Sequence, residues 1–213
     1  MDIEKVLLIM QKEAKDAPVY KLEKNSDASP FQILIATLLS ARTKDTTTAK
    51  ILPELFKRAK TPEQFLKINK KELEKTLYWI GFYRIKTRRV KEVSRIILDK
   101  FGGIVPKTIE ELLTLPGVGR KTANIVLARA FGRDTLGVDV HVHRISNRLG
   151  LVRTKKPEET EEKLMKILEK KHIRKFNKTL VAYGQTICVP IRPFCSICKL
   201  NDVCPKDGVK NPR

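Results

Sequence analysis

The position of the cysteines constrains this chain most, because all four fall within the last 26 of its 213 residues. Cysteines that only fill a core would be scattered through apolar segments, whereas these lie in one short stretch interrupted by prolines. The four residues have the spacing C-x6-C-x2-C-x5-C and are Cys188, Cys195, Cys198 and Cys204. This pattern predicts that their thiolates hold one inorganic group between them.

The spacing also bears on which group is held. Disulfides are disfavoured because the N-terminal sequence, MDIEKVLLIMQKEAKDA, does not resemble a secretion signal. Zinc sites with four thiolates usually use two short C-x2–4-C pairs, and only one is present here. A four-iron, four-sulfur cluster also takes four thiolates and tolerates wider spacing. The sequence therefore favours the 4Fe-4S cluster, with structural zinc as the alternative.

The charge of the chain indicates the class of its partner. The sequence holds 44 Lys and Arg against 24 Asp and Glu, a formal net charge of +20. Such an excess attracts polyanions, and DNA is the commonest of these, although general solubility or a ribosomal or membrane-surface role also fits. No segment is apolar and long enough for a membrane span. We expect a globular protein of the reducing cytoplasm, from a prokaryote.

Apolar residues recur mostly at helical spacing, which predicts an all-α fold. Ser29 and Pro30 form an N-cap and a first helical position before FQILIATLLSA, a run apolar on all sides that we interpret as a buried central helix. Thr61 and Thr108 begin capping-box spacings. Amphipathic helices are expected at 83–101 and 157–171.

One segment departs from this pattern. The sequence VDVHVH at 138–143 alternates with a period of two, which would indicate a strand if it stood alone. It is equally consistent with Asp139 as the N-cap of a following helix.

A tight hairpin is predicted between two helical patterns at LPGVG, residues 115–119. Pro116 disfavours continuing the first helix, and Gly117 and Gly119 permit the backbone angles of a very short turn. Together with Val118, these residues would present backbone N–H groups at a helix N-terminus, where a phosphate oxygen can bind. Such a contact reads the DNA backbone and not its sequence. An ordinary αα-hairpin with no ligand is the other interpretation.

The hairpin LPGVGRKTANIV, the segment VDVHVHRISNRLG and the cysteine array together resemble the endonuclease III family, the iron–sulfur DNA glycosylases of the helix-hairpin-helix superfamily. The resemblance extends from FQILIATLLSAR through IGFYRIKTRRV to the last cysteine. It implies two helical lobes with a DNA-binding cleft. One lobe is a helical barrel at 22–132, with the helix-hairpin-helix motif at about 108–131. The other combines 1–21 with 133–213 and holds the 4Fe-4S cluster in the loop 188–204.

The resemblance also implies an activity. Members remove oxidised pyrimidines from double-stranded DNA and cleave the strand at the resulting abasic site by β-elimination, and we expect this chain to do so as a monomer. The damaged nucleotide is flipped out of the duplex. Lys121 matches the nucleophile that forms a Schiff base with the sugar, and Asp139 matches its acidic partner. A surface lysine and a plain helix cap are the alternatives for these residues.

The same resemblance suggests DNA contacts. Arg42 and Phe82 occupy the positions that fill the opened duplex, where the bacterial pattern has glutamine and leucine. These departures leave the choice of opposite base open, and a core aromatic is the alternative for Phe82. Lys86, Arg144 and Arg192 are candidate phosphate contacts, and a solvated surface charge is the alternative for each.

Two other functions compete with this one. A monofunctional glycosylase that removes uracil or thymine opposite guanine would lack the lysine. A non-catalytic iron–sulfur DNA-binding protein would keep the charge, the hairpin and the cysteines but would need neither Lys121 nor Asp139. The presence of both residues at the matching positions favours the bifunctional enzyme.

Overall fold

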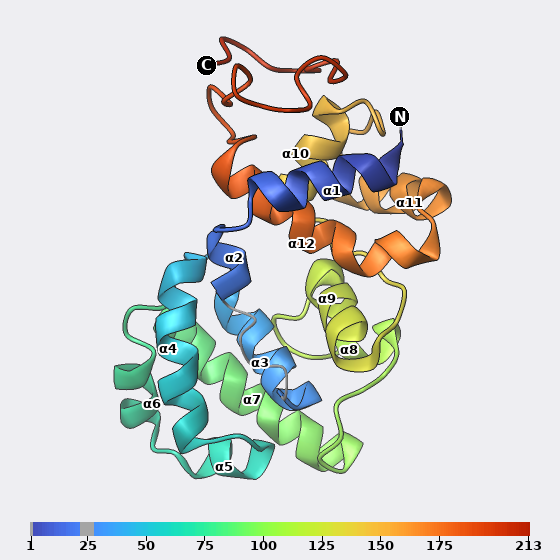
Figure 1. The fold of residues 1–213 in the computed structure, drawn as a ribbon. Coiled ribbons are helices and arrows are strands. Elements are labelled where there is room, and N and C mark those ends of the chain that lie inside the picture. Colours follow the sequence, from blue (N-terminus) through green and yellow to red (C-terminus); the bar gives the residue numbers. More distant parts are fainter. Residues whose placement is uncertain (1, 22–27) are drawn as a thin grey trace. The chain divides into compact units, whose positions relative to one another are not determined.

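The computed structural model describes residues 2–21 and 28–213, and helices are the only regular secondary structure in these two ranges. This confirms the predicted all-α class (Figure 1). Among the described residues, no helix is both long and apolar enough to cross a membrane.

The chain separates into two compact units. One comprises Met1–Tyr20 together with Asp134–Arg213, and the other comprises Lys21–Arg133. Each unit has a hydrophobic core of its own. The termini of the chain therefore contribute to the same unit, and the hairpin at 115–119 belongs to the other.

The unit Lys21–Arg133 is built around a buried helix, α3. Its helices are α3 (Pro30–Ser40), α4 (Asp45–Arg58), α5 (Pro62–Lys67), α6 (Lys70–Thr76), α7 (Tyr83–Phe101), α8 (Ile109–Leu113) and α9 (Arg120–Phe131). Helix α3 contacts α4, α7 and α9 (Figure 1). Six of its eleven residues are buried, which confirms the expected central helix.

Side-chain caps set where several of these helices begin. The Ser29 hydroxyl accepts from the backbone N of Gln32 at 3.3 Å, and the Gln32 side chain accepts from the backbone N of Ser29 at 2.9 Å. This is the reciprocal capping box, with Pro30 as the first helical residue. The hydroxyls of Thr61 and Thr108 cap α5 and α8 by accepting from the backbone N of Gln64 and Glu111. The return bond of a capping box is replaced at both helices, because the Gln64 side chain accepts from the backbone N of Lys60 and the Glu111 side chain accepts from the Thr108 hydroxyl.

The second unit combines the N-terminal helices with the C-terminal part of the chain. Its helices are α1 (Ile3–Glu13), α2 (Pro18–Lys21), α10 (Val140–Arg148), α11 (Pro157–Ile167) and α12 (Lys170–Thr186). Helix α12 packs against α1 and α10, and α10 also contacts α11. The segment after α12 has no regular secondary structure and carries the four cysteines.

Two expectations for this unit need correction. The single helix expected at 157–171 is interrupted, because Leu168 and Glu169 are extended and the Leu168 side chain is buried in the core. The strand interpretation of 138–143 is wrong, since α10 begins at Val140 with Asp139 as its N-cap.

Candidate functional site

The hairpin between α8 and α9 is built as its sequence requires. Gly117 has a φ of +83°, in the left-handed region that a side chain disfavours. A Cβ added there would lie 2.9 Å from Cδ of Arg89, so the residue is constrained by both conformation and space. Val118 is buried, and its backbone N donates to the Leu115 carbonyl at 3.0 Å. Gly119 is the N-cap of α9 and has no side chain to cover the helix N-terminus.

Lys121 is the second residue of α9 and its side chain is exposed. The opposite face of the helix is anchored in the core by Ala123, Val126 and Leu127. The helix therefore presents this amine on its first turn, directly after the hairpin, where the side chain is open to solvent.

Asp139 is half-buried at the start of α10. Its Oδ1 accepts from the backbone N of His141 at 2.9 Å and from that of Val142 at 2.8 Å. The N-cap interpretation is thus confirmed, and the cap fixes the orientation of the carboxylate. Lys121 and Asp139 belong to different units.

Arg42 and Phe82 lie in two loops of the same unit that are tied together. Both residues are exposed, and both have a left-handed backbone, with φ of +54° and +59°. This conformation costs roughly 1–2 kcal/mol for a residue with a side chain. The backbone N of Gly81 donates to Oγ1 of Thr43 at 3.1 Å, and a Cβ at position 81 would lie 2.6 Å from the Arg42 carbonyl oxygen. Only glycine permits this approach of the loops. The core position left open for Phe82 is wrong, since 60% of the residue is exposed.

Lys86 joins the same two loops from within the protein. It is only 6% exposed, and its Nζ donates to the carbonyls of Leu39 and Ala41 at 2.8 and 2.5 Å and to Oγ1 of Thr43 at 2.9 Å. Burial, and to a lesser extent the charge of Arg89, lower the pKa of Lys86 from 10.5 to about 8. The expected phosphate contact is therefore corrected: this ammonium faces inward and fastens the end of α3 and the loop of Arg42.

Arg144, a candidate phosphate contact, is half-buried and serves as an internal anchor. Its Nη2 donates to the carbonyls of Gly184 and Cys188 at 3.2 and 2.8 Å and lies 3.1 Å from Nδ1 of His141. Burial lowers the pKa of Arg144. The guanidinium thus fixes the end of α12 where the cysteine loop begins, and a phosphate contact from it is not supported.

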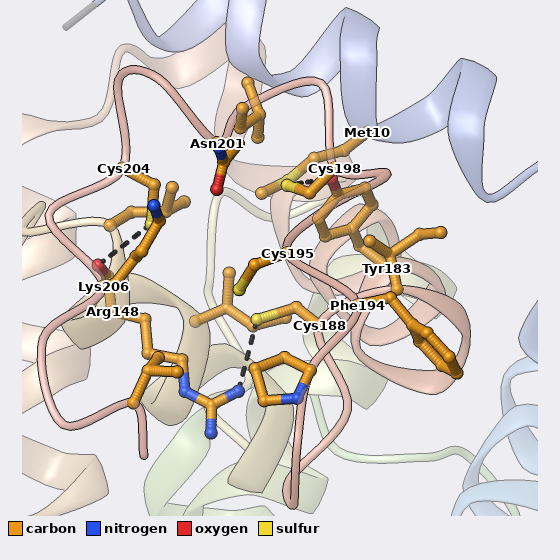
Figure 2. Close-up of a pocket in the computed structure, with 16 residues that line it drawn as sticks. Met10, Arg148, Tyr183, Cys188, Phe194, Cys195, Cys198, Asn201, Cys204 and Lys206 are labelled. Carbon is orange, nitrogen blue, oxygen red and sulfur yellow. Dashed lines mark hydrogen bonds between the residues drawn. The ribbon is translucent and has the colours of Figure 1, made fainter. Parts of the chain in front are cut away.

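The four cysteines line one pocket (Figure 2). All four are half-buried and none forms a disulfide. The other walls are largely apolar and include Met10, Tyr183, Phe194 and Leu200. Within the described ranges, no three His, Cys, Asp or Glu side chains are placed to hold a single metal ion; the four cysteines are instead distributed around one shared pocket.

Two buried side chains direct polar hydrogens at the cysteine sulfurs. Nη1 of Arg148 donates to Sγ of Cys188 at 3.4 Å, and the Tyr183 hydroxyl lies 3.0 Å from Sγ of Cys198 (Figure 2). Arg148 also donates to the carbonyls of Val189 and Pro190, at 2.8 and 2.7 Å. Burial raises the pKa of Tyr183, so its hydroxyl keeps its proton. Neither residue was predicted from the sequence, although Arg148 lies in the segment VDVHVHRISNRLG and Tyr183 lies shortly before Cys188.

The donor set fits an iron–sulfur cluster. Burial raises the pKa of the Cys195 and Cys204 thiols, so thiolates at these positions need a compensating positive charge such as iron supplies. Four sulfur ligands, apolar walls and hydrogen bonds to sulfur are the features that such clusters use.

Arg192 lies on the cysteine loop with its side chain exposed. Its φ is +50°, and its carbonyl accepts from Nε of Arg213 at 3.0 Å. Arg42, Phe82 and Arg192 are thus all among the few described non-glycine residues with positive φ. A strained backbone of this kind persists only where surrounding contacts enforce it, and it is common at functional sites.

Fold, hairpin and cysteine loop together define the class of protein. The chain belongs to the HhH-GPD superfamily of base excision DNA repair proteins, whose family model matches residues 35–170. Within this superfamily it is a member of the endonuclease III family: it is 47% identical over 180 residues to endonuclease III of Thermotoga maritima, with 84% of each chain covered.

Solved structures give the same result. A non-covalent endonuclease III–DNA complex superposes with a TM-score of 0.85 at 36% identity, covering 96% of this chain and 94% of that one. A trapped endonuclease III–DNA covalent intermediate gives a TM-score of 0.79 at 34% identity, covering 92% and 96%.

Proposed function

We propose that this protein is a bifunctional DNA glycosylase and abasic-site lyase that removes oxidised pyrimidines from double-stranded DNA. The observation that carries the proposal is the position of Lys121, exposed on the first turn of α9 directly after the hairpin. A monofunctional relative has no use for an amine at this position. The endonuclease III relatives, two of them in complexes with DNA, support the reaction class.

The chemistry follows from the amine. The neutral Nζ of Lys121 attacks C1′ of the flipped nucleotide, the bond from C1′ to the base breaks, and the base leaves with a proton. The remaining N–H proton then moves to O4′ as the C1′–O4′ bond breaks and the sugar ring opens, which gives the Schiff base between Nζ and C1′. Removal of a C2′ proton then expels the 3′ phosphate and cuts the strand. Water finally hydrolyses the Schiff base and restores the lysine.

The environment of the amine must change on DNA binding. A lysine at its reference pKa of ~10.4 is neutral in only about 1 part in 2,500 at pH 7. Because Lys121 is exposed in the protein alone, we infer that the flipped nucleotide itself excludes the water around it. Asp139, whose carboxylate is oriented by the α10 backbone, accepts the proton and stabilises positive charge on the sugar.

Other residues hold the DNA open. The N–H groups of Gly117 and Gly119 and of the α9 N-terminus bind phosphate oxygens, while the N–H of Val118 holds the turn through Leu115. Arg42 and Phe82 enter the gap left by the flipped nucleotide, where the arginine can donate to a guanine edge and the phenylalanine can stack. Their enforced left-handed backbones hold both side chains outward before DNA arrives.

The cysteines hold a 4Fe-4S cluster in this proposal. Bound by Cys188, Cys195, Cys198 and Cys204, the cluster supplies a rigid cross-link for a segment without regular secondary structure. Arg192 on the same loop is then fixed in place to contact phosphate. Structural zinc is the competing assignment. Visible absorbance separates the two, because a cluster gives a brown protein with broad visible absorbance and zinc is colourless.

The decisive test scores base release separately from strand cleavage. Duplexes with thymine glycol, uracil opposite guanine, thymine opposite guanine or a preformed abasic site are incubated with the protein, and both products are measured. The proposal predicts release of thymine glycol with cleavage of the same strand. Release without cleavage would assign the protein to the monofunctional mismatch glycosylases, and binding without either product to the non-catalytic alternative. We expect activity as a monomer in the cytoplasm, where the cysteines stay reduced.

A further inference from the structure

An exposed aromatic cluster lies in the turn between α6 and α7. Trp79, the only tryptophan of the chain, is 76% exposed and Tyr78 is 57% exposed. The Tyr78 ring stands edge-on to Trp79 at 5.3 Å between centroids and lies 5.4 Å from the ring of Tyr83. Tyr83 in turn packs against the core of its unit. The cluster is therefore a supported surface, with its outermost ring open to solvent.

The surroundings of the cluster indicate what covers it. The guanidinium of Arg84 lies 5.4 Å from the centroid of the Tyr83 ring. Three exposed arginines, Arg84, Arg88 and Arg89, lie on the first turns of α7, and the segment from Arg84 to Lys91 contains no acidic residue. A partner for this surface needs a flat apolar face together with negative charge. Nucleic acid meets both conditions, because bases stack on aromatic rings while the phosphates contact the basic groups.

The cluster is also fastened to the loops that carry Arg42 and Phe82. Two residues after Trp79, the backbone N of Gly81 donates to Thr43, and Gly81 approaches the Arg42 carbonyl so closely that no side chain fits. Phe82 follows with 60% of its surface exposed. The turn that carries the aromatic cluster is therefore joined directly to the loops of the residues proposed to enter the opened duplex.

We propose that Trp79, supported edge-on by Tyr78, is a stacking platform for the base that loses its partner when the damaged nucleotide is flipped out. The inference rests on the proposed function, because only a protein that opens the duplex creates such a base. The inference gives the protein a further binding site, which contacts the undamaged strand. Aromatic stacking holds that strand and tolerates any base.

The single tryptophan makes the test direct. A duplex with a tetrahydrofuran abasic-site analogue opposite adenine resists cleavage by the lyase and leaves the adenine unpaired. Titrating the cluster-containing protein with this duplex should quench the fluorescence of Trp79 in a saturable manner. A duplex with the analogue on both strands should quench it much less. Equal quenching by the two duplexes, or none at saturation, would overturn the proposal.

Variants give an independent measurement by fluorescence anisotropy of labelled DNA. Trp79→Ala should weaken binding of the duplex with the unpaired adenine about tenfold, and Trp79→Phe should recover most of the loss. Ile104→Ala is the matched control, since Ile104 is an exposed apolar residue of the same unit, 65% exposed and outside the cluster. Unchanged binding by Trp79→Ala would contradict the platform.

The same samples separate failure of this inference from failure of the proposed function. If the parent protein releases thymine glycol and cleaves the strand while Trp79→Ala binds normally, only the platform is wrong. If the parent shows neither activity and does not prefer the abasic duplex over intact DNA, the proposed function itself fails.

Discussion

Lys86 places one buried ammonium at the junction of two loops, and its three donors have three acceptors in the protein. Two of these acceptors are the carbonyls of Leu39 and Ala41 at the end of α3, where no further helical turn can satisfy them. The third, Thr43, also binds Gly81. The residue thus positions the loops of Arg42 and Phe82 without contacting DNA itself.

Replacing this lysine should destabilise the protein. In Lys86→Met the buried carbonyls lose their donor, and an unsatisfied buried polar group costs about 1–3 kcal/mol. We expect a loss of this size in the free energy of unfolding, measured with urea, at pH 7. Lys100→Met, at an exposed lysine on the last turn of the same helix, should change it by less than about 0.5 kcal/mol. A similar small effect at Lys86 would contradict the buried role.

The pKa of Lys86 gives a pH dependence with a definite sign. In the folded protein the pKa is about 8, against 10.5 for an unperturbed lysine, so between these values the unfolded chain binds more protons than the folded one. Stability from this site therefore rises with pH across that window. Unfolding free energies of the parent minus those of Lys86→Met should increase from pH 8 to pH 10. If this difference in unfolding free energy instead decreased from pH 8 to pH 10, the hydrogen bonds to the ammonium would outweigh the cost of burying its charge.

The spacing of residues along α7 indicates that Lys86 is buried, although a lysine by its type is expected at the surface. Lys86 stands in helical register with Val90, Val93 and Ile97, all of them on the buried face of α7. A lysine is nevertheless expected at the surface, because its acceptors come from loops far away in the chain. Hairpin glycines and helix caps could be predicted because their cause is local. The positions of four side chains could not be predicted in this way, because they depend on tertiary contacts: Lys86, Arg144, Arg148 and Tyr183.

The packing of α10 against α12 requires a glycine at position 184. A Cβ there would lie 2.5 Å from Nδ1 of His141 and 2.9 Å from Nη2 of Arg144. The same close approach lets Arg144 reach the carbonyl of Cys188. The contact between the two helices thus sets where the cysteine loop starts.

Gly184→Ala should disturb both the helices and the cysteine loop. Overpacking of this kind costs about 1–3 kcal/mol, and we expect the visible absorbance per protein to fall as the bound cluster is lost more readily on heating. Because the shortest clash is with the His141 ring, Gly184→Ala combined with His141→Ala should recover part of the stability, which a double-mutant cycle measures. An additive pair would contradict the close contact.

Most helices could be predicted because their own sequences contain the signals that begin and end them. Helix α7 spans the expected residues, and α3 begins at the expected cap. The break between α11 and α12 could not be predicted, because residues 168–171, LEKK, have ordinary helical composition. Burial of Leu168 in an extended conformation decides the break, and that is a property of the assembled unit.

At the scale of the whole molecule, the net charge of +20 supplies attraction to DNA without choosing a site. In the proposed function, discrimination comes from Arg42 and Phe82 and from the amine of Lys121. The sequence indicated these candidates because the hairpin, Lys121 and Asp139 lie in local motifs, and Lys121 and Asp139 belong to different units. The proposed reaction requires the flipped nucleotide to exclude water from the exposed Lys121.

The most direct test of the account is borohydride trapping on a duplex containing an abasic site. Reduction converts the Schiff base into a stable covalent link, so the parent protein should give a protein–DNA product of reduced mobility in a denaturing gel. Lys121→Ala should give no trapped product while still binding an uncleavable abasic duplex, and Lys100→Ala should trap like the parent. Trapping by Lys121→Ala at the parental level would show that another amine attacks the sugar and would contradict the assignment.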